Sequence, residues 1–91
     1  MKPSFKIENV VASITINQTI DLNVISANVP GVEYNPEQFP GLIYRLSKPR
    51  TATLIFSSGK MVCTGAKHED EVKTAVNKIY QKLKELGVLY E

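Results

Sequence analysis

Apolar and polar residues alternate along residues 6–17, and a period of two places successive side chains on opposite faces of a β-strand. The pattern therefore predicts a long first strand. Its even-numbered residues are expected to face the core: Val10, Ala12, Ile14 and Ile16. Its odd-numbered residues form the other face: Asn9, Val11, Ser13 and Thr15. That second face carries no charge, which is unusual for a surface in water and indicates a surface meant to be covered.

Similar alternation predicts further strands later in the chain, at residues 32–34, 41–47, 51–57 and 60–66. Turn-forming residues separate the last three of them. Lys48-Pro49-Arg50 lies in the first gap and Ser58-Gly59 in the second. The two phenylalanines of this region, Phe39 and Phe56, mark the ends of strands rather than their middles.

Two helices are also predicted. Asp21 can cap a short helix that ends near Asn28, before Pro30 and Gly31. The longer helix spans residues 69–86, where apolar residues recur with the 3.6-residue period of an amphipathic helix: Val72, Ala75, Val76, Ile79, Leu83 and Leu86. Acidic residues begin this helix and lysines end it, as the helix dipole favours.

The order of elements predicts an α+β domain, with an antiparallel, curved sheet of about five strands and both helices on one of its faces. The other face is then left uncovered. Its expected members are Asn9, Val11, Leu54, Phe56, Val62 and Thr64. An exposed apolar surface of this extent usually marks an interaction site.

Charge changes this picture. The stretch 39–67 contains five basic residues and no Asp or Glu, although the net charge of the chain is only +2. Because this stretch supplies most of the sheet, we expect an uncovered face with a basic rim and no carboxylates. Such a surface suits a polyanion with apolar interior surfaces, which describes nucleic acid. The alternative is an ordinary β-meander with solvated lysines.

Length and cysteine content limit the setting. Ninety-one residues predict one domain, spanning 1–91. The single cysteine, Cys63, is expected to be buried as a small hydrophobe, and it cannot form an internal disulfide. No apolar run is long enough to cross a bilayer, and the N-terminus lacks the apolar core of a signal peptide. We therefore expect a cytoplasmic protein.

Several motifs resemble one repeat of the TATA-box-binding protein family in its archaeal form. They are IENVV, NPEQFPG, LIYRL, the turn KPR, and LIFSSGK followed by TGAK. The resemblance covers residues 6–88. It implies a basal transcription factor that binds and bends the minor groove of TATA-box promoter DNA, and this family is the standard example of that behaviour. It also implies a transcription factor B homologue and RNA polymerase as partners, and association with the nucleoid of an archaeal cell.

The resemblance assigns roles by position. Phe39 and Phe56 match the wedge that unstacks a base step, with Pro40 beside it. Asn9 and Thr64 match the polar residues that donate to the minor-groove acceptors of A·T pairs. Residues that match the apolar groove floor are Val11, Leu54 and Val62. Residues that match the phosphate rim are Arg45, Arg50, Ser58, Lys60 and Lys67.

Three departures from the family accompany the resemblance. Family chains carry two tandem repeats and this chain carries one, so we expect either a homodimer formed through residues 6–17 or half of a longer chain. Gln38 stands where many members have Arg, and His68 replaces the usual Ser before the last helix. A histidine caps a helix less well than a serine, by about 1 kcal/mol.

Two other classes of function stay open at this point. The uncovered face could be a protein-interaction module that bends no DNA, or an RNA-binding sheet that stacks bases on Phe39 and Phe56. An enzyme is the least favoured class, since no nucleophile–base pair or phosphate-cradling loop is present in the sequence. A lone His and a lone Cys do not make a metal site, so no metal and no cofactor is expected.

Overall fold

The computed structural model describes residues 10–89. The elements follow the predicted order: β1 (Val10–Thr15), α1 (Leu22–Asn28), β2 (Glu33–Tyr34), β3 (Leu42–Ser47), β4 (Arg50–Ile55), β5 (Lys60–Ala66) and α2 (Glu69–Glu85). The predicted first strand was too long at its C-terminal end, because the chain leaves the sheet after Thr15. Its predicted residues 6–9 lie outside the described part.

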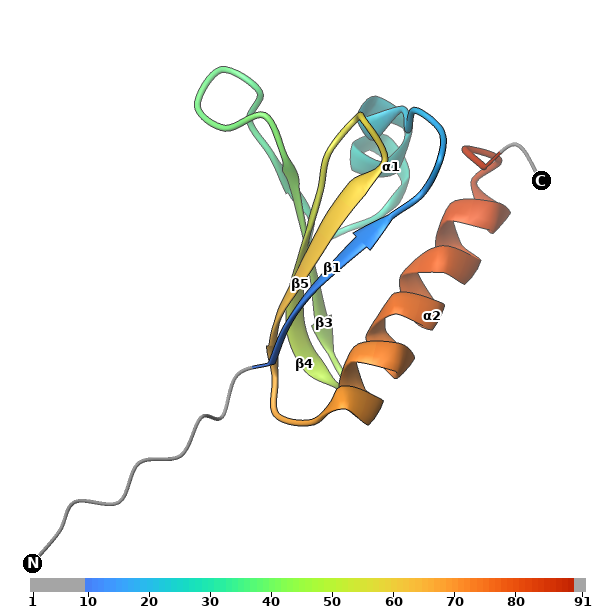
Figure 1. Ribbon diagram of the computed structural model, residues 1–91. Helices are drawn as coiled ribbons and strands as arrows, with labels where there is room; N and C mark the ends of the chain where they lie inside the picture. The colour runs from blue at the N-terminus through green and yellow to red at the C-terminus, as the bar shows by residue number, and fades with distance from the viewer. Residues whose placement is uncertain (1–9, 90–91) are drawn as a thin grey trace, which may run out of the picture.

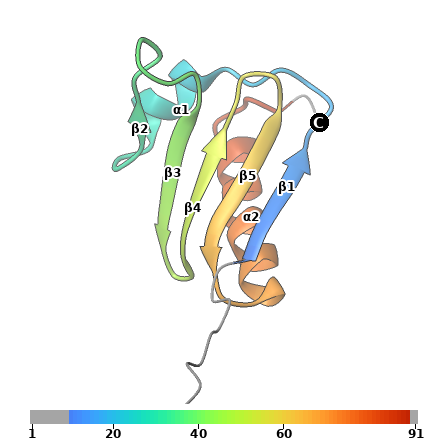
Figure 2. The same cartoon turned by 60° about the vertical axis from the view of Figure 1, so that its left-hand side comes forward.

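The five strands form one antiparallel sheet in the order β1-β5-β4-β3-β2. Both helices lie on the same side of this sheet (Figure 1), and α2 runs behind it in the turned view (Figure 2). Among residues 10–89, no helix or strand covers the other side. The α+β class and the one-sided arrangement of the helices are therefore confirmed.

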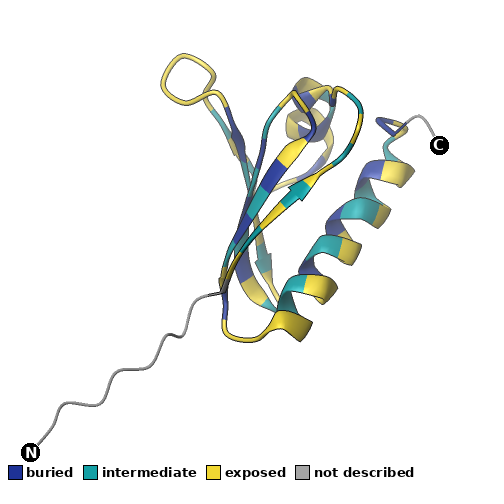
Figure 3. Ribbon diagram, viewed as in Figure 1, coloured by how far each residue is buried: buried dark blue, intermediate teal, exposed yellow. Residues whose placement is uncertain are grey.

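The core lies between the sheet and the helices. Each strand contributes one set of alternating side chains to it, so buried and less buried residues alternate along the sheet (Figure 3). The largest fully buried side chains are Ile25, Leu42, Ile55, Met61, Ile79, Leu83, Thr53 and Cys63. The burial of Cys63 agrees with its prediction as a small hydrophobe.

Local chemistry sets the ends of the helices. The Asp21 carboxylate accepts the N–H of Asn23 at 3.0 Å, which caps α1 as predicted. His68 makes no capping bond with its side chain, and the Glu71 carboxylate instead accepts the N–H of Lys67 at 2.6 Å. At the other end of α2, Gly87 donates to the carbonyl of Lys84 and Val88 to that of Leu83, which is the Schellman arrangement.

Candidate nucleic-acid interface

The uncovered face is built from rows of side chains that lie opposite one another on adjacent strands. In one row, Leu54 of β4 lies between Ile43 of β3 and Val62 of β5, and Val62 also pairs with Ser13 of β1. In the next row, Ala52 lies between Arg45 and Thr64. The apolar members are half-buried although no described element covers them. The face therefore has an apolar floor along its middle, as the alternation predicted.

Val11 extends this floor to the edge strand. Its side chain is 63% exposed, which is the largest exposure among the bulky apolar residues described. A β-bulge lies here, because Thr64 and Gly65 of β5 together oppose Val11 alone, between the pairs Val10–Ala66 and Ala12–Cys63. The other residue assigned to this strand, Asn9, lies outside the described residues.

Phe39 and Phe56 meet at one end of the face. Phe39 precedes β3 and Phe56 follows β4, and the two strands are paired at this end through Leu42 and Ile55. The ring centroids are 5.9 Å apart with an interplanar angle of 64°, an edge-to-face contact. Phe39 is 38% exposed and Phe56 is half-buried. Pro40, which follows Phe39, is exposed. The aromatic pair is thus held together at the margin and remains open to a ligand.

Cationic residues lie at both ends of the strands. Lys60 begins β5 at the phenylalanine end, next to the turn that contains Ser58. Arg50 begins β4 at the opposite end, and Lys67 follows the end of β5 there. All four residues are exposed. The basic residues therefore border the apolar floor rather than interrupt it.

One expectation about charge was wrong. The uncovered face carries a carboxylate, because Glu33 of β2 pairs in register with Ile43 of β3 and forms an ion pair with Arg45. The stretch 39–67 itself has no acidic residue, but strand pairing brings one to its edge from outside that stretch. The rim position assigned to Arg45 is thus partly neutralised within the chain.

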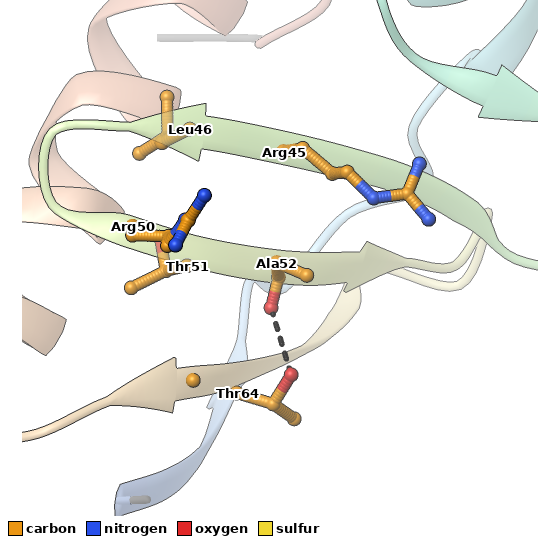
Figure 4. A pocket seen from close by; sticks show the side chains of 7 residues that line it. Arg45, Leu46, Arg50, Thr51, Ala52 and Thr64 are labelled. Carbon is orange, nitrogen blue, oxygen red and sulfur yellow. Dashed lines mark hydrogen bonds between the residues drawn. The ribbon is translucent and has the colours of Figure 1, made fainter.

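A shallow cavity of about 400 Å³ opens at the end of the face away from the phenylalanines. Its lining includes Arg45, Arg50, Ala52 and Thr64, drawn in Figure 4. The Thr64 hydroxyl donates to the carbonyl of Ala52 at 3.3 Å across the two strands. This bond orients the hydroxyl, and the oxygen keeps acceptor capacity for a group that approaches the floor.

Comparison with known proteins decides the family. Residues 4–86 match the family model described as "Transcription factor TFIID (or TATA-binding protein, TBP)". The chain belongs to this family. The predicted resemblance is therefore confirmed over nearly the whole chain.

Two of the TATA-box-binding proteins that the chain matches come from archaea. The chain is 56% identical over 88 residues to a TATA-box-binding protein of Pyrobaculum aerophilum, covering 97% of this chain and 44% of that protein. It is 54% identical over 82 residues to TATA-box-binding protein B of Halobacterium salinarum, covering 90% of this chain and 44% of that protein. The chain thus spans about half the length of the relatives it matches.

A solved TATA-binding protein has the same fold. The structure of Methanococcus jannaschii TBP matches with a TM-score of 0.85 and 48% sequence identity. The match covers 89% of this chain and 48% of that chain. The α+β architecture described above is therefore that of the TATA-binding protein family.

The sequence patterns did not reveal three residues of this chain that shape the candidate interface. Ile43 completes the floor, and its position two residues before Arg45 could have placed it there. Gly41 lies beneath the phenylalanine pair, which only the packing shows. Glu33 reaches the face through a two-residue strand, a length too short for its pattern to reveal which face each residue occupies.

The described residues contain no group of three His, Cys, Asp or Glu side chains that could hold a metal ion. Within residues 10–89, neither helix is long and apolar enough to cross a membrane.

Proposed function

We propose that this chain binds the minor groove of TATA-box promoter DNA and bends it, as a basal factor in transcription initiation with no enzymatic activity. The observation that carries the proposal is the uncovered sheet face, which has an apolar floor, an aromatic pair at one end and cations at both ends. The cytoplasm, in association with the nucleoid, is the proposed setting.

The floor favours the minor groove of A·T-rich DNA. A G·C pair projects an amino donor into the minor groove, whereas A·T pairs present only acceptors there. Floor residues such as Leu54, Val62 and Val11 have no side-chain acceptor for that amino group. A G·C pair placed on them would bury a donor without a partner. Asn9, by resemblance, supplies a donor for the acceptors of A·T pairs. Thr64 can also donate to them once its hydroxyl turns away from the carbonyl of Ala52.

The aromatic pair supplies the wedge. Proteins that bind the minor groove insert apolar side chains between base steps and kink the duplex, and this family is itself the standard example. Phe39 and Phe56 lie at the end of the face, next to each other, so that two rings can enter one step together. TA steps are among the easiest to unstack, which favours a TATA sequence. Pro40 follows Phe39. Because proline has no backbone N–H, the protein main chain presents no donor there to the unstacked base step.

The border residues attract the phosphates. Exposed Arg50, Lys60 and Lys67 lie at the ends of the strands, where the DNA backbone would pass on either side of the groove floor. Ser58, in the turn beside Lys60, can donate to a phosphate oxygen. Contacts of this kind orient the duplex and carry no sequence information.

DNA bending tests the proposal. A TATA-containing duplex labelled at both ends with a donor and an acceptor dye should show increased energy transfer when the chain saturates it. A G·C-rich duplex of equal length should bind more weakly and show no change in transfer. A TATA duplex that stays straight at saturation would contradict the proposed function and leave the face as a protein-interaction surface.

We further propose that residues 1–91 act as a single repeat. β1 is an edge strand, and its described sequence VVASIT contains no charged residue or proline to prevent pairing with another strand. Two copies of the chain paired through β1 would form a continuous sheet around a two-fold axis. The same edge would serve a second repeat if the chain is half of a longer protein.

Sedimentation tests the dimer. At micromolar concentration the 10.1 kDa chain should sediment as a species of twice that mass without DNA, and as two chains per duplex with DNA. A 10 kDa species without DNA, together with one chain per duplex in its presence, would contradict the dimer without affecting the proposed DNA binding. A transcription factor B homologue and RNA polymerase are the proposed protein partners, on the basis of the resemblance.

A further inference from the structure

Glu33 and Arg45 form an ion pair on the surface of the proposed DNA-binding face. Glu33 pairs in register with Ile43, so its side chain and that of Arg45 are diagonal neighbours on one face of the sheet. Both side chains are about half exposed, at 51% for Glu33 and 55% for Arg45. A bound duplex could therefore reach either group.

The ion pair determines where the arginine points. Arg45 lies directly opposite Ala52, beside the cavity that Arg50 and Thr64 also line. In Figure 4 the Arg45 side chain runs along the sheet with its guanidinium pointing away from Arg50, although Arg45 contributes to the cavity lining. Glu33 holds the guanidinium at that position. The Arg45 guanidinium is thus directed to the edge strand β2 rather than toward Arg50.

A paired arginine contributes little to the attraction of DNA. Binding to DNA releases about 0.9 counterion for each phosphate that a cation neutralises. A guanidinium that already faces a carboxylate brings no net charge to a phosphate. In addition, the carboxylate repels the phosphate itself. Exposed ion pairs are weak, so removal of one partner frees the other without disturbing the fold.

We propose that Glu33 is a positioning residue that restrains Arg45 and lowers the charge-driven affinity of this face for any duplex. This inference rests on the proposed function, because it concerns how the same face meets DNA. As a consequence, phosphate attraction contributes less to the affinity for DNA than it would if Arg45 were unpaired. A larger share of binding then comes from contacts with the groove floor, which read the sequence.

Salt-dependent binding tests the proposal through the isosteric variant Glu33→Gln. The affinity for a G·C-rich duplex, followed by fluorescence anisotropy as the salt concentration is raised, should fall with a slope steeper by about one than in the unmodified chain. At about 0.15 M salt this difference corresponds to an affinity gain on the order of fivefold. Unchanged slope and affinity would overturn the proposal.

Two further variants separate restraint of Arg45 from a change in net charge. Glu69→Gln removes the same charge from the exposed first turn of α2 and should leave the slope nearly unchanged. Arg45→Gln alone leaves the Glu33 carboxylate unpaired beside the duplex and should lower the affinity for the G·C-rich duplex. Combined with Glu33→Gln, it should abolish the gain. Equal effects of Glu33→Gln and Glu69→Gln would contradict the proposal.

The TATA duplex measured in parallel distinguishes the two hypotheses. A preference for TATA over G·C-rich DNA, with no effect of Glu33→Gln, would overturn only the role of Glu33. If the unmodified chain shows no preference for TATA, but Glu33→Gln still steepens the salt dependence of binding, only the proposed function would be overturned. A chain that binds neither duplex would overturn both.

Discussion

Gly41 approaches Phe39 so closely that a Cβ atom on Gly41 would lie 2.8 Å from Cε2 of the Phe39 ring. The same Cβ would lie 3.0 Å from Cε1 of Phe56. Gly41 is itself buried, so the missing side chain leaves the space that both rings occupy. The position of the aromatic pair therefore depends on a glycine that makes no contact with DNA in the proposed complex.

We predict that Gly41→Ala displaces the rings and reduces DNA bending. The rings are at the margin of the fold and can move, so the free energy of unfolding should change by less than about 1 kcal/mol. Energy transfer on an end-labelled TATA duplex should fall clearly at saturating protein. Asn35→Ala, in the exposed loop before Phe39, should retain the full change in transfer. Full bending by Gly41→Ala would show that the ring positions do not matter.

Phe56→Ala and Lys60→Ala should separate the wedge from the rim. Phe56→Ala removes a ring and should abolish the bend, with little change in the salt dependence of binding. Lys60→Ala removes one cation and should weaken binding to all sequences, with a salt slope smaller by about one. Energy transfer and anisotropy titrations measure the two effects. If both variants behaved alike, the division of the face into wedge and rim would be wrong.

Thr53→Val should stabilise the fold. The Thr53 side chain is 1% exposed, and its hydroxyl is the one buried side-chain oxygen or nitrogen without a hydrogen-bond partner among the described residues. Valine has nearly the same shape and removes the unsatisfied group, so the free energy of unfolding should rise by about 1 kcal/mol. Urea denaturation measures this change.

Thr51→Val is the matched control. Thr51 lies two residues before Thr53 in β4, and its side chain is buried on the same face of the sheet. The Thr51 hydroxyl donates to the carbonyl of Pro49 at 3.4 Å, so its removal should bring no comparable gain. Equal stabilisation by both variants would mean that the missing partner of Thr53 is not the cause.

Gly59→Ala should destabilise the chain far more than Gly31→Ala. Both glycines have positive φ, +95° at Gly59 and +86° at Gly31, and an alanine in that region costs about 1–2 kcal/mol. At Gly31 a Cβ meets nothing within 4 Å, whereas at Gly59 it would lie 2.2 Å from the carbonyl oxygen of Ile16. That oxygen is main chain and cannot turn aside. Thermal unfolding should show a loss of at least about 3 kcal/mol for Gly59→Ala, and equal losses would contradict the prediction.

Tyr44 should make the fold less stable in strong base. Burial, and secondarily the negative charge of Glu85, raises the pKa of Tyr44 above its ordinary value of 10.0. The folded state therefore favours the neutral phenol. Its contribution to stability is complete below a pH of about 10 and is lost as the pH rises through the folded pKa.

Urea denaturation at several pH values, with the Tyr44→Phe variant in parallel, measures this loss. The unmodified chain should lose stability relative to Tyr44→Phe above a pH of about 10 and keep a constant difference below it. Glu85→Gln should reduce the loss without abolishing it, because burial is the larger cause. Parallel curves for the unmodified chain and Tyr44→Phe at all pH values would contradict the assignment.

The sequence alone determined the order of elements and the two faces of the sheet. Strand alternation and the helical period depend only on residue spacing, so Leu54, Val62 and Thr64 could be placed on one face and Met61 and Cys63 on the other. The motifs from NPEQFPG to TGAK were also enough to identify the family. They assigned Phe39 and Phe56 to one site although sixteen residues lie between them in the sequence.

Only the tertiary structure decided which residues from distant or very short segments join that face. Glu33 reaches Arg45 through a strand of two residues, and the bulge at Val11 shifts the register by one residue. Gly41 is explained only by the two rings that pack above it. Pattern reasoning tells on which face a side chain lies, whereas pairing register and packing depend on contacts between segments, and no local spacing specifies those contacts.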